Sequence, residues 1–144
     1  MTEPIRRTAH VSCAVEQAFE IFTAQIDRWW PPGHRRFPES VLVLEARDGG
    51  KFFEKSSRGE EALLGEVVQC NPPHSISYTW YPGALTGPTL VEITFSPDEA
   101  GTLVQVTHSE GSAQLGDVWP ERAAIFTRAW SQVLPAYAEY AGTA

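Results

Sequence analysis

The residues best suited to acid–base chemistry are His108 and Glu110, which lie two positions apart in a segment of alternating polar and apolar residues. In a β-strand such residues point to the same face, which they would share with Val104 and Val106. An imidazole beside a carboxylate can transfer a proton at neutral pH. Tyr78, on another expected strand, would add a phenol hydroxyl. These are the candidates for catalysis, but a hydrogen bond from His108 to the following loop is the preferred interpretation, and we assign no catalytic residue.

Other catalytic and cofactor motifs are missing from the sequence. Its four histidines never fall at H-x-x-x-H or H-E-x-x-H spacing, and there is no G-x-S-x-G, P-loop or G-x-G-x-x-G motif. Cys13 and Cys70 lie far apart without C-x-x-C spacing, which favours buried thiols over a disulfide or a zinc site. We therefore expect no metal and no cofactor.

Length and charge narrow the function classes. The 144 residues suit one domain, which we place at residues 1–144. The net charge of −7 repels phosphate backbones and anionic lipid surfaces, so neither nucleic acid nor a membrane is an expected partner. No apolar run approaches the roughly 18 residues of a membrane span, and the first residues lack the apolar stretch of a signal peptide. With two unpaired cysteines, these features predict a cytoplasmic protein.

The elements that must position the candidate residues begin with a strand and a helix. Ile5–Ser12 alternates weakly and predicts a strand, and Val15–Trp29 then carries apolar residues at helical spacing. Pro31-Pro32-Gly33 ends that helix, because the first proline disfavours α geometry in the residue before it.

From Ser40 to Glu110 the sequence predicts a succession of β-strands separated by turn residues. The strongest turn signal is Asp48-Gly49-Gly50, which predicts a hairpin. Further turns are expected at 71–73, 82–83 and 86–88, and residues 96–101 should connect the last two strands. The expected strands are Val41–Arg47, Lys51–Ser56, Ala62–Gln69, His74–Tyr81, Thr89–Phe95 and Thr102–His108.

A long amphipathic helix is expected from about Pro120 to Tyr140, opening near Asp117. Pro135 lies inside it and predicts a bend. Apolar residues three or four apart form one stripe that must face the sheet: Phe126, Trp130, Val133, Leu134 and Tyr137.

One helix about 10 Å wide is too narrow to cover six or seven strands, so the sheet must curl around it and leave an internal cavity. For Trp29 and Trp30, at the end of the first helix, core packing competes with a place at the cavity rim. Arg35 and Arg36 could meet an anionic group at the mouth, although adjacent arginines on a polar loop are more often solvated. The side chains expected to line the cavity are Trp30, Tyr78, Trp80, Phe95, Val106, His108, Phe126 and Trp130.

Short motifs follow one another along nearly the whole chain: Val15–Phe19, Trp29-Trp30-Pro31, Gly49–Phe52, Gly65-Glu66-Val67, Asn71-Pro72-Pro73, Tyr78-Thr79-Trp80, Gly101-Thr102 and Trp130. This ordered set resembles the activator-of-Hsp90-ATPase-homologue family, in the START-like, Bet v 1-like superfamily. The resemblance implies an α+β helix-grip fold: a curved antiparallel sheet of about seven strands around a long C-terminal helix, with two short helices after the first strand. The chain departs from the family pattern at Ala129, where a glycine is usual, and at Pro135.

Relatives with this fold bind sterols, lipids, plant hormones or polyketides, so the resemblance implies a cavity for an apolar small molecule. We expect a binding protein for a small, largely apolar ligand, and two alternatives stay open. The first is a cyclase- or aromatase-like enzyme in which Tyr78, His108 or Glu110 moves protons on a polyketide or aromatic substrate. The second is a co-chaperone-like interaction domain. An Hsp90-type partner is the less favoured reading, and a homodimer stays open.

Overall fold

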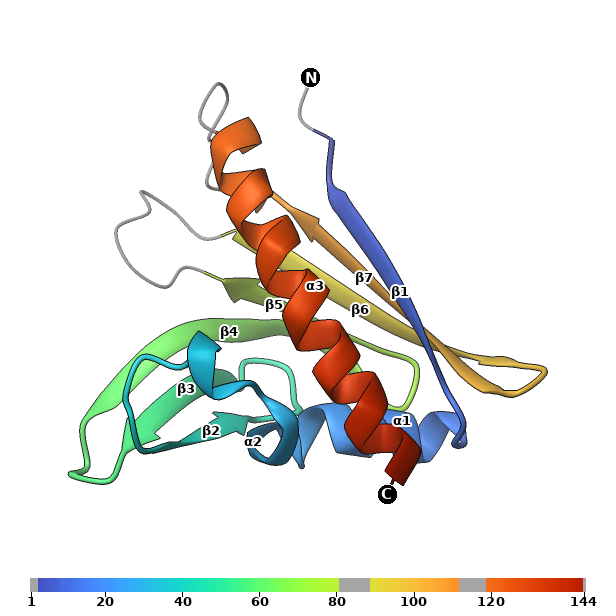
Figure 1. Ribbon diagram of the computed structural model, residues 1–144, viewed down its shortest axis with the longest axis horizontal. Helices are drawn as coiled ribbons and strands as arrows, with labels where there is room; N and C mark the ends of the chain where they lie inside the picture. Colours follow the sequence, from blue (N-terminus) through green and yellow to red (C-terminus); the bar gives the residue numbers. More distant parts are fainter. Residues whose placement is uncertain (1–2, 81–88, 112–118, 144) are drawn as a thin grey trace.

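The computed structural model describes residues 3–80, 89–111 and 119–143. Within these residues, seven antiparallel strands form one sheet in the order β1-β7-β6-β5-β4-β3-β2, and the long helix α3 lies across it (Figure 1). The predicted α+β helix-grip fold is confirmed. The elements are β1 (Ile5–Val11), α1 (Val15–Thr23), α2 (Ile26–Trp29), the 3-10 turn η1 (Pro32–His34), β2 (Ser40–Leu44), β3 (Lys51–Ser56), β4 (Glu61–Asn71), β5 (Ser75–Trp80), β6 (Thr89–Asp98), β7 (Gly101–Ser109) and α3 (Trp119–Thr143).

The segment from Val15 to Trp29 forms two helices where its spacing predicts one. Gln25 leaves helical geometry (φ −106°, ψ 21°), and the chain turns before Ile26. The turn brings the indole N–H of Trp29 to the carbonyl oxygen of Ile21, to which it donates at 2.9 Å. Because apolar residues recur at similar spacing on both sides of the turn, periodicity alone does not reveal it.

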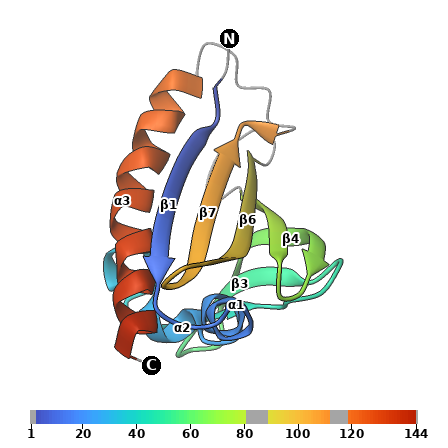
Figure 2. The same ribbon diagram turned by 90° about the vertical axis from the view of Figure 1, so that its right-hand side faces the viewer.

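Two register irregularities and one close approach of strands accompany the curl of the sheet. The pairing of β3 with β4 shifts between Phe52 and Phe53, and that of β4 with β5 shifts between Val67 and Gln69. Bulges of this kind bend a strand and increase its twist. A Cβ atom at Gly65 would lie 1.7 Å from the carbonyl oxygen of Thr79, so this approach of β4 to β5 requires glycine. Figure 2 shows the resulting curvature, with β3 and β4 turned away from the direction of β1 and β7.

Helix α3 presents its apolar stripe to the sheet, as the sequence predicts. The Tyr137 hydroxyl donates to the carbonyl oxygen of Ala18 at 2.8 Å and so joins α3 to α1. The helix continues through Pro135, whose side chain is exposed. No helix in the described parts of the chain is long and apolar enough to cross a membrane. Four residues of the stripe are buried, namely Trp130, Val133, Leu134 and Tyr137, and Phe126 is half-buried.

The hairpin predicted at residues 48–50 is confirmed, with β2 and β3 paired on either side and Gly49 at a φ of 78°. The connection expected at 96–101 is shorter than predicted. Strand β6 continues through Pro97, which pairs with Thr102, and β7 begins at Gly101. Phe95 is the last buried apolar residue of β6, so the alternating signal ends before the strand does.

Some expectations concern residues beyond the described ranges, namely the turns at 82–83 and 86–88 and the helix start near Asp117. Cys13 and Cys70 are free thiols, as expected, but they are half-buried rather than buried. Burial raises the pKa of both thiols.

Candidate functional site

A cavity of about 70 Å³ lies between α3 and the concave face of the sheet. Its wall combines residues of α3, β5 and β7 with two residues that follow α2. Among the described residues, no Asp, Glu, Lys or Arg contributes to this wall, so the lining is largely apolar. It consists of Trp30, His34, Tyr78, Trp80, His108, Phe126, Ala129, Trp130 and Val133.

The lining divides into a floor and a rim according to burial. Five side chains are buried and form the floor: Trp30, Tyr78, His108, Trp130 and Val133. Four are half-buried and form the rim: His34, Trp80, Phe126 and Ala129. A molecule entering from solvent would therefore pass between η1, the end of β5 and α3.

Six of the eight residues that the sequence assigns to a cavity lie in this wall, and Phe95 and Val106 do not. Strand pairing explains the difference, because His108 lies opposite Val91, whereas Val106 and Phe95 lie further along the same two strands. There α1 covers the sheet, and the ring of Phe95 packs 5.3 Å from that of Phe19. Both residues belong to the solid core below the cavity.

His108 is the centre of a chain of hydrogen bonds that crosses from helix to sheet. The indole N–H of Trp130 donates to its Nδ1 at 3.0 Å. Its Nε2–H donates to the Thr89 hydroxyl at 2.9 Å, and that hydroxyl donates to the carbonyl oxygen of Trp80 at 2.7 Å. These partners fix the neutral Nε2–H tautomer. Burial lowers the pKa of His108 to about 4, which also favours the neutral ring.

The contacts of His108 favour the structural one of its two expected roles. Both ring nitrogens already have hydrogen-bond partners within the protein, Thr89 and Trp130. The ring also stacks on Phe126, with centroids 4.4 Å apart. His108 thus joins α3 to the sheet, and its partners lie on β6 and α3 rather than on the loop after β7 that the sequence suggests.

Tyr78 has the opposite character. Its side chain is completely buried, and its hydroxyl is the one buried side-chain polar atom of the described residues without a hydrogen-bond partner. An unpaired buried hydroxyl costs about 1–3 kcal/mol. Burial also raises the pKa of Tyr78, so the phenol stays protonated and can donate.

Three residues of the wall are not among those assigned from sequence: His34, Ala129 and Val133. His34 joins the rim to α3, since its Nε2–H donates to Oε1 of Gln132 at 2.6 Å. Its carbonyl oxygen accepts the indole N–H of Trp30 at 3.1 Å. Val133 belongs to the predicted stripe of α3, and Ala129 stands one position before Trp130. The helical spacing of α3 could therefore have indicated Val133 and Ala129, whereas the position of His34 depends on the course of the loop.

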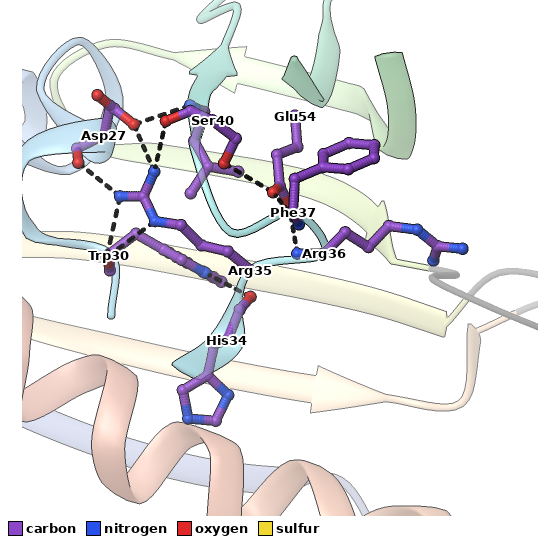
Figure 3. A network of polar contacts seen from close by, with 9 residues as sticks. Asp27, Trp30, His34, Arg35, Arg36, Phe37, Ser40 and Glu54 are labelled. Carbon is purple, nitrogen blue, oxygen red and sulfur yellow. Dashed lines mark hydrogen bonds and ion pairs between the residues drawn. The ribbon is translucent and has the colours of Figure 1, made fainter. Parts of the chain in front are cut away.

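The side chains of Arg35 and Glu54 hold the segment that follows His34 in place (Figure 3). The Arg35 guanidinium donates to a carboxylate oxygen of Asp27 at 2.6 Å and to the carbonyl oxygens of Asp27, Trp30 and Ser40. Its side chain is only 12% exposed, so Arg35 is neither solvated nor available to an anionic ligand. Arg36 is exposed, and its guanidinium extends away from this network in Figure 3.

Glu54 anchors the next part of the same loop. It is 1% exposed and accepts the backbone N–H groups of Arg36 and Phe37, each at 2.9 Å, and the Ser40 hydroxyl at 2.7 Å. A buried carboxylate is tolerated when its oxygens are bonded in this way. Glu54 and Arg35 together fix the loop between η1 and β2, and with it one side of the rim.

A second depression, of about 430 Å³, lies beside the β3–β4 hairpin. It is larger but more open, and most of its wall is exposed, including Glu39, Ser57, Arg58 and Glu60. It has the character of a solvated surface groove, and the cavity under α3 is the candidate site.

A helix-grip domain with an apolar cavity between its sheet and its long helix is the class of protein that this geometry defines. The chain belongs to the family of activator of Hsp90 ATPase homolog 1-like proteins, whose model matches residues 12–142. The family that the sequence motifs resemble is thus confirmed. A search of curated proteins finds no match.

Solved structures show the same fold over nearly the full chain. A protein from Rhodobacter sphaeroides is 20% identical, with 96% of this chain and 91% of that chain covered and a TM-score of 0.73. Protein MLL2253 from Mesorhizobium loti is 16% identical, with 94% of each chain covered and a TM-score of 0.72. The anthrahydroquino-γ-pyrone synthase Txn09, solved as a complex, is 25% identical, with 95% of this chain and 96% of that chain covered and a TM-score of 0.64.

Proposed function

We propose that this protein binds a small, largely apolar molecule in the cavity between α3 and the sheet. The observation that carries the proposal is an apolar wall that includes Tyr78, a residue whose buried hydroxyl has no hydrogen-bond partner. Ligand sites have this composition, with mostly aromatic and aliphatic side chains and a few polar groups that fix orientation. We place the protein in a reducing compartment such as the cytoplasm, because its two cysteines are unpaired.

Native mass spectrometry of the purified protein tests the proposal directly, since a resident ligand would add a defined mass. A titration with apolar compounds, followed by tryptophan fluorescence, tests it when the site is empty. Trp30, Trp80 and Trp130 all lie in the wall, so a ligand there should quench or shift the emission saturably.

Ala129→Phe provides the variant for this titration, because it places a phenyl ring at the rim and should abolish the response. Ala124→Phe is the matched control, since Ala124 is exposed on the same helix and outside the wall. Circular dichroism should show both variants folded. A response that persists in Ala129→Phe places the ligand elsewhere, and no response from any compound in any variant refutes the proposal.

Chemistry on the bound molecule is a second candidate, and the likeness to the synthase Txn09 favours it. Among the wall residues, Tyr78 would be the proton donor, because His108 is fully engaged. Mass spectrometry of cyclic and open-chain polyketide mimics incubated with the protein would detect a change of bonding. Loss of that change in Tyr78→Phe would support the enzyme, whereas recovery of every compound unchanged supports binding alone.

A further inference from the structure

The size of the cavity limits the molecule that can fill it. A volume of about 70 Å³ corresponds to roughly five water positions at ~15 Å³ each, or ~150 Å³ of liquid, and an apolar cavity of ~150 Å³ holds benzene. Such a space suits one substituted ring. A molecule with three fused rings would have to displace Trp30, Trp130 or their neighbours from the buried floor.

The charges around the cavity limit the ligand further. The part of the wall that the structure describes holds no acidic residue, lysine or arginine, and His108 is held neutral by its two partners. The guanidinium of Arg35, next to His34 in the chain, already donates to the Asp27 carboxylate and to three backbone carbonyl oxygens. An ionised ligand would lose its hydration without gaining a counter-charge, which is strongly unfavourable.

The hydrogen bonds of the floor leave one group for a ligand. The indole N–H groups of Trp30 and Trp130 are already donated within the protein. The Tyr78 hydroxyl has no partner, and it carries a proton to donate. A ligand acceptor that reaches it would satisfy a group whose desolvation has already occurred on folding.

We propose that the ligand is an uncharged molecule with a single ring and a carbonyl or similar acceptor that takes the hydrogen bond of Tyr78. This inference rests on the proposed function and assigns Tyr78 as the residue that determines specificity.

Acetophenone and α-methylstyrene test the hydrogen bond, because they share one shape and differ by an oxygen in place of a methylene group. Benzoate tests charge, and anthraquinone tests size. Binding is followed by ¹H–¹⁵N spectra of the tryptophan indole N–H groups in the intact protein. Acetophenone should bind about 2- to 12-fold more tightly than α-methylstyrene, the range expected for one hydrogen bond, and benzoate and anthraquinone should bind far more weakly.

Tyr78→Phe should bring acetophenone to the level of α-methylstyrene while leaving the latter unchanged. Tyr137→Phe is the matched control, because this second buried tyrosine lies outside the wall, and it should preserve the preference for acetophenone.

The outcomes separate this inference from the proposed function. Equal binding of acetophenone and α-methylstyrene in the native protein, or a preference unchanged in Tyr78→Phe, overturns the role of the hydroxyl while leaving apolar binding intact. If benzoate binds more tightly than acetophenone, the ligand need not be uncharged. If anthraquinone binds more tightly than acetophenone, the ligand need not have a single ring. Failure of every compound, α-methylstyrene included, overturns both.

Discussion

Tyr78 and Tyr137 are two fully buried tyrosines with opposite hydrogen-bonding states. The Tyr137 hydroxyl donates to Ala18, and the Tyr78 hydroxyl has no partner. A buried polar atom without a partner is usually selected against, because it destabilises the empty protein. Tyr78 lines the cavity, so under the proposed function its hydroxyl would meet its partner when a ligand is bound.

The pair gives a prediction about stability. Tyr78→Phe removes an unsatisfied group and should raise the free energy of unfolding of the ligand-free protein by up to about 1–3 kcal/mol. Tyr137→Phe removes a hydrogen bond and should lower it by about 1 kcal/mol. Urea unfolding of both variants beside the native protein measures the difference. A loss of stability in Tyr78→Phe as large as that in Tyr137→Phe would mean that the Tyr78 hydroxyl is satisfied after all.

His108 predicts how stability depends on pH. Burial lowers its pKa in the folded protein to about 4, against an ordinary value of 6.5. Between these values the unfolded chain binds more protons than the folded one, so stability rises with pH. The contribution of His108 is complete above about pH 6.5 and falls by roughly 3 kcal/mol as the pH drops toward 4.

The measurement is urea unfolding at several pH values between 4 and 7.5, compared with His108→Asn, in which this part of the pH dependence should disappear. NMR of the imidazole nitrogens supplies the independent check. The Nε2–H tautomer should persist to about pH 5. A ring that protonates near pH 6.5 in the folded protein would contradict the hydrogen-bonded chain.

At the scale of elements, α3 depends on Trp130 both for apolar contact and for its hydrogen bond to His108. Trp130→Ala should lower the free energy of unfolding by about 3–5 kcal/mol. Trp130→Phe keeps a ring but leaves Nδ1 of His108 without a donor, so it should cost less, with about 1–3 kcal/mol of the loss due to the hydrogen bond. Urea midpoints of the two variants test this order, and a shift below about 1 kcal/mol in Trp130→Ala would refute the core role.

The loop between η1 and β2 gives a prediction of its own. Arg36 and Phe37 donate to different oxygens of Glu54, and Glu54→Gln replaces one of these oxygens with an NH₂ group, which cannot accept the N–H that it faces. The loop should loosen, with a loss of about 1–3 kcal/mol in stability and faster hydrogen exchange at the one of these two amides that loses its acceptor. Glu39→Gln, at an exposed position nearby, serves as the control. Unchanged exchange in Glu54→Gln would show that the loop is held by Arg35 alone.

At the scale of the whole molecule, the architecture could be predicted because its signals are periodic and local. Phe126, Trp130 and Val133 recur at helical spacing, and Asp48-Gly49-Gly50 marks a hairpin whatever lies around it. The resemblance to the family added the two short helices after the first strand. Periodicity does not reveal the break at Gln25, because the break leaves the spacing of the apolar residues almost unchanged.

The cavity could be predicted only in part, because alternation reports which face a residue occupies and not how far along the strand the cavity extends. Phe95 and Val106 face inward as expected, but α1 covers that end of the sheet. His34 enters through a loop whose course depends on Arg35 and Glu54. The missing partner of Tyr78 is a property of the packed molecule and has no counterpart in the sequence.

The contacts of Asp27 and Arg35 also determine how the sheet can meet other molecules. Strand β2 is one edge of the sheet, and an edge with free N–H and C=O groups invites another chain to add a strand. Here Asp27 accepts the N–H of Leu42 at 2.9 Å, and Arg35 donates to the carbonyl oxygen of Ser40 at 3.2 Å. The two side chains occupy the places of a neighbouring strand at Ser40 and Leu42, so a second chain could add to this part of β2 only by displacing them.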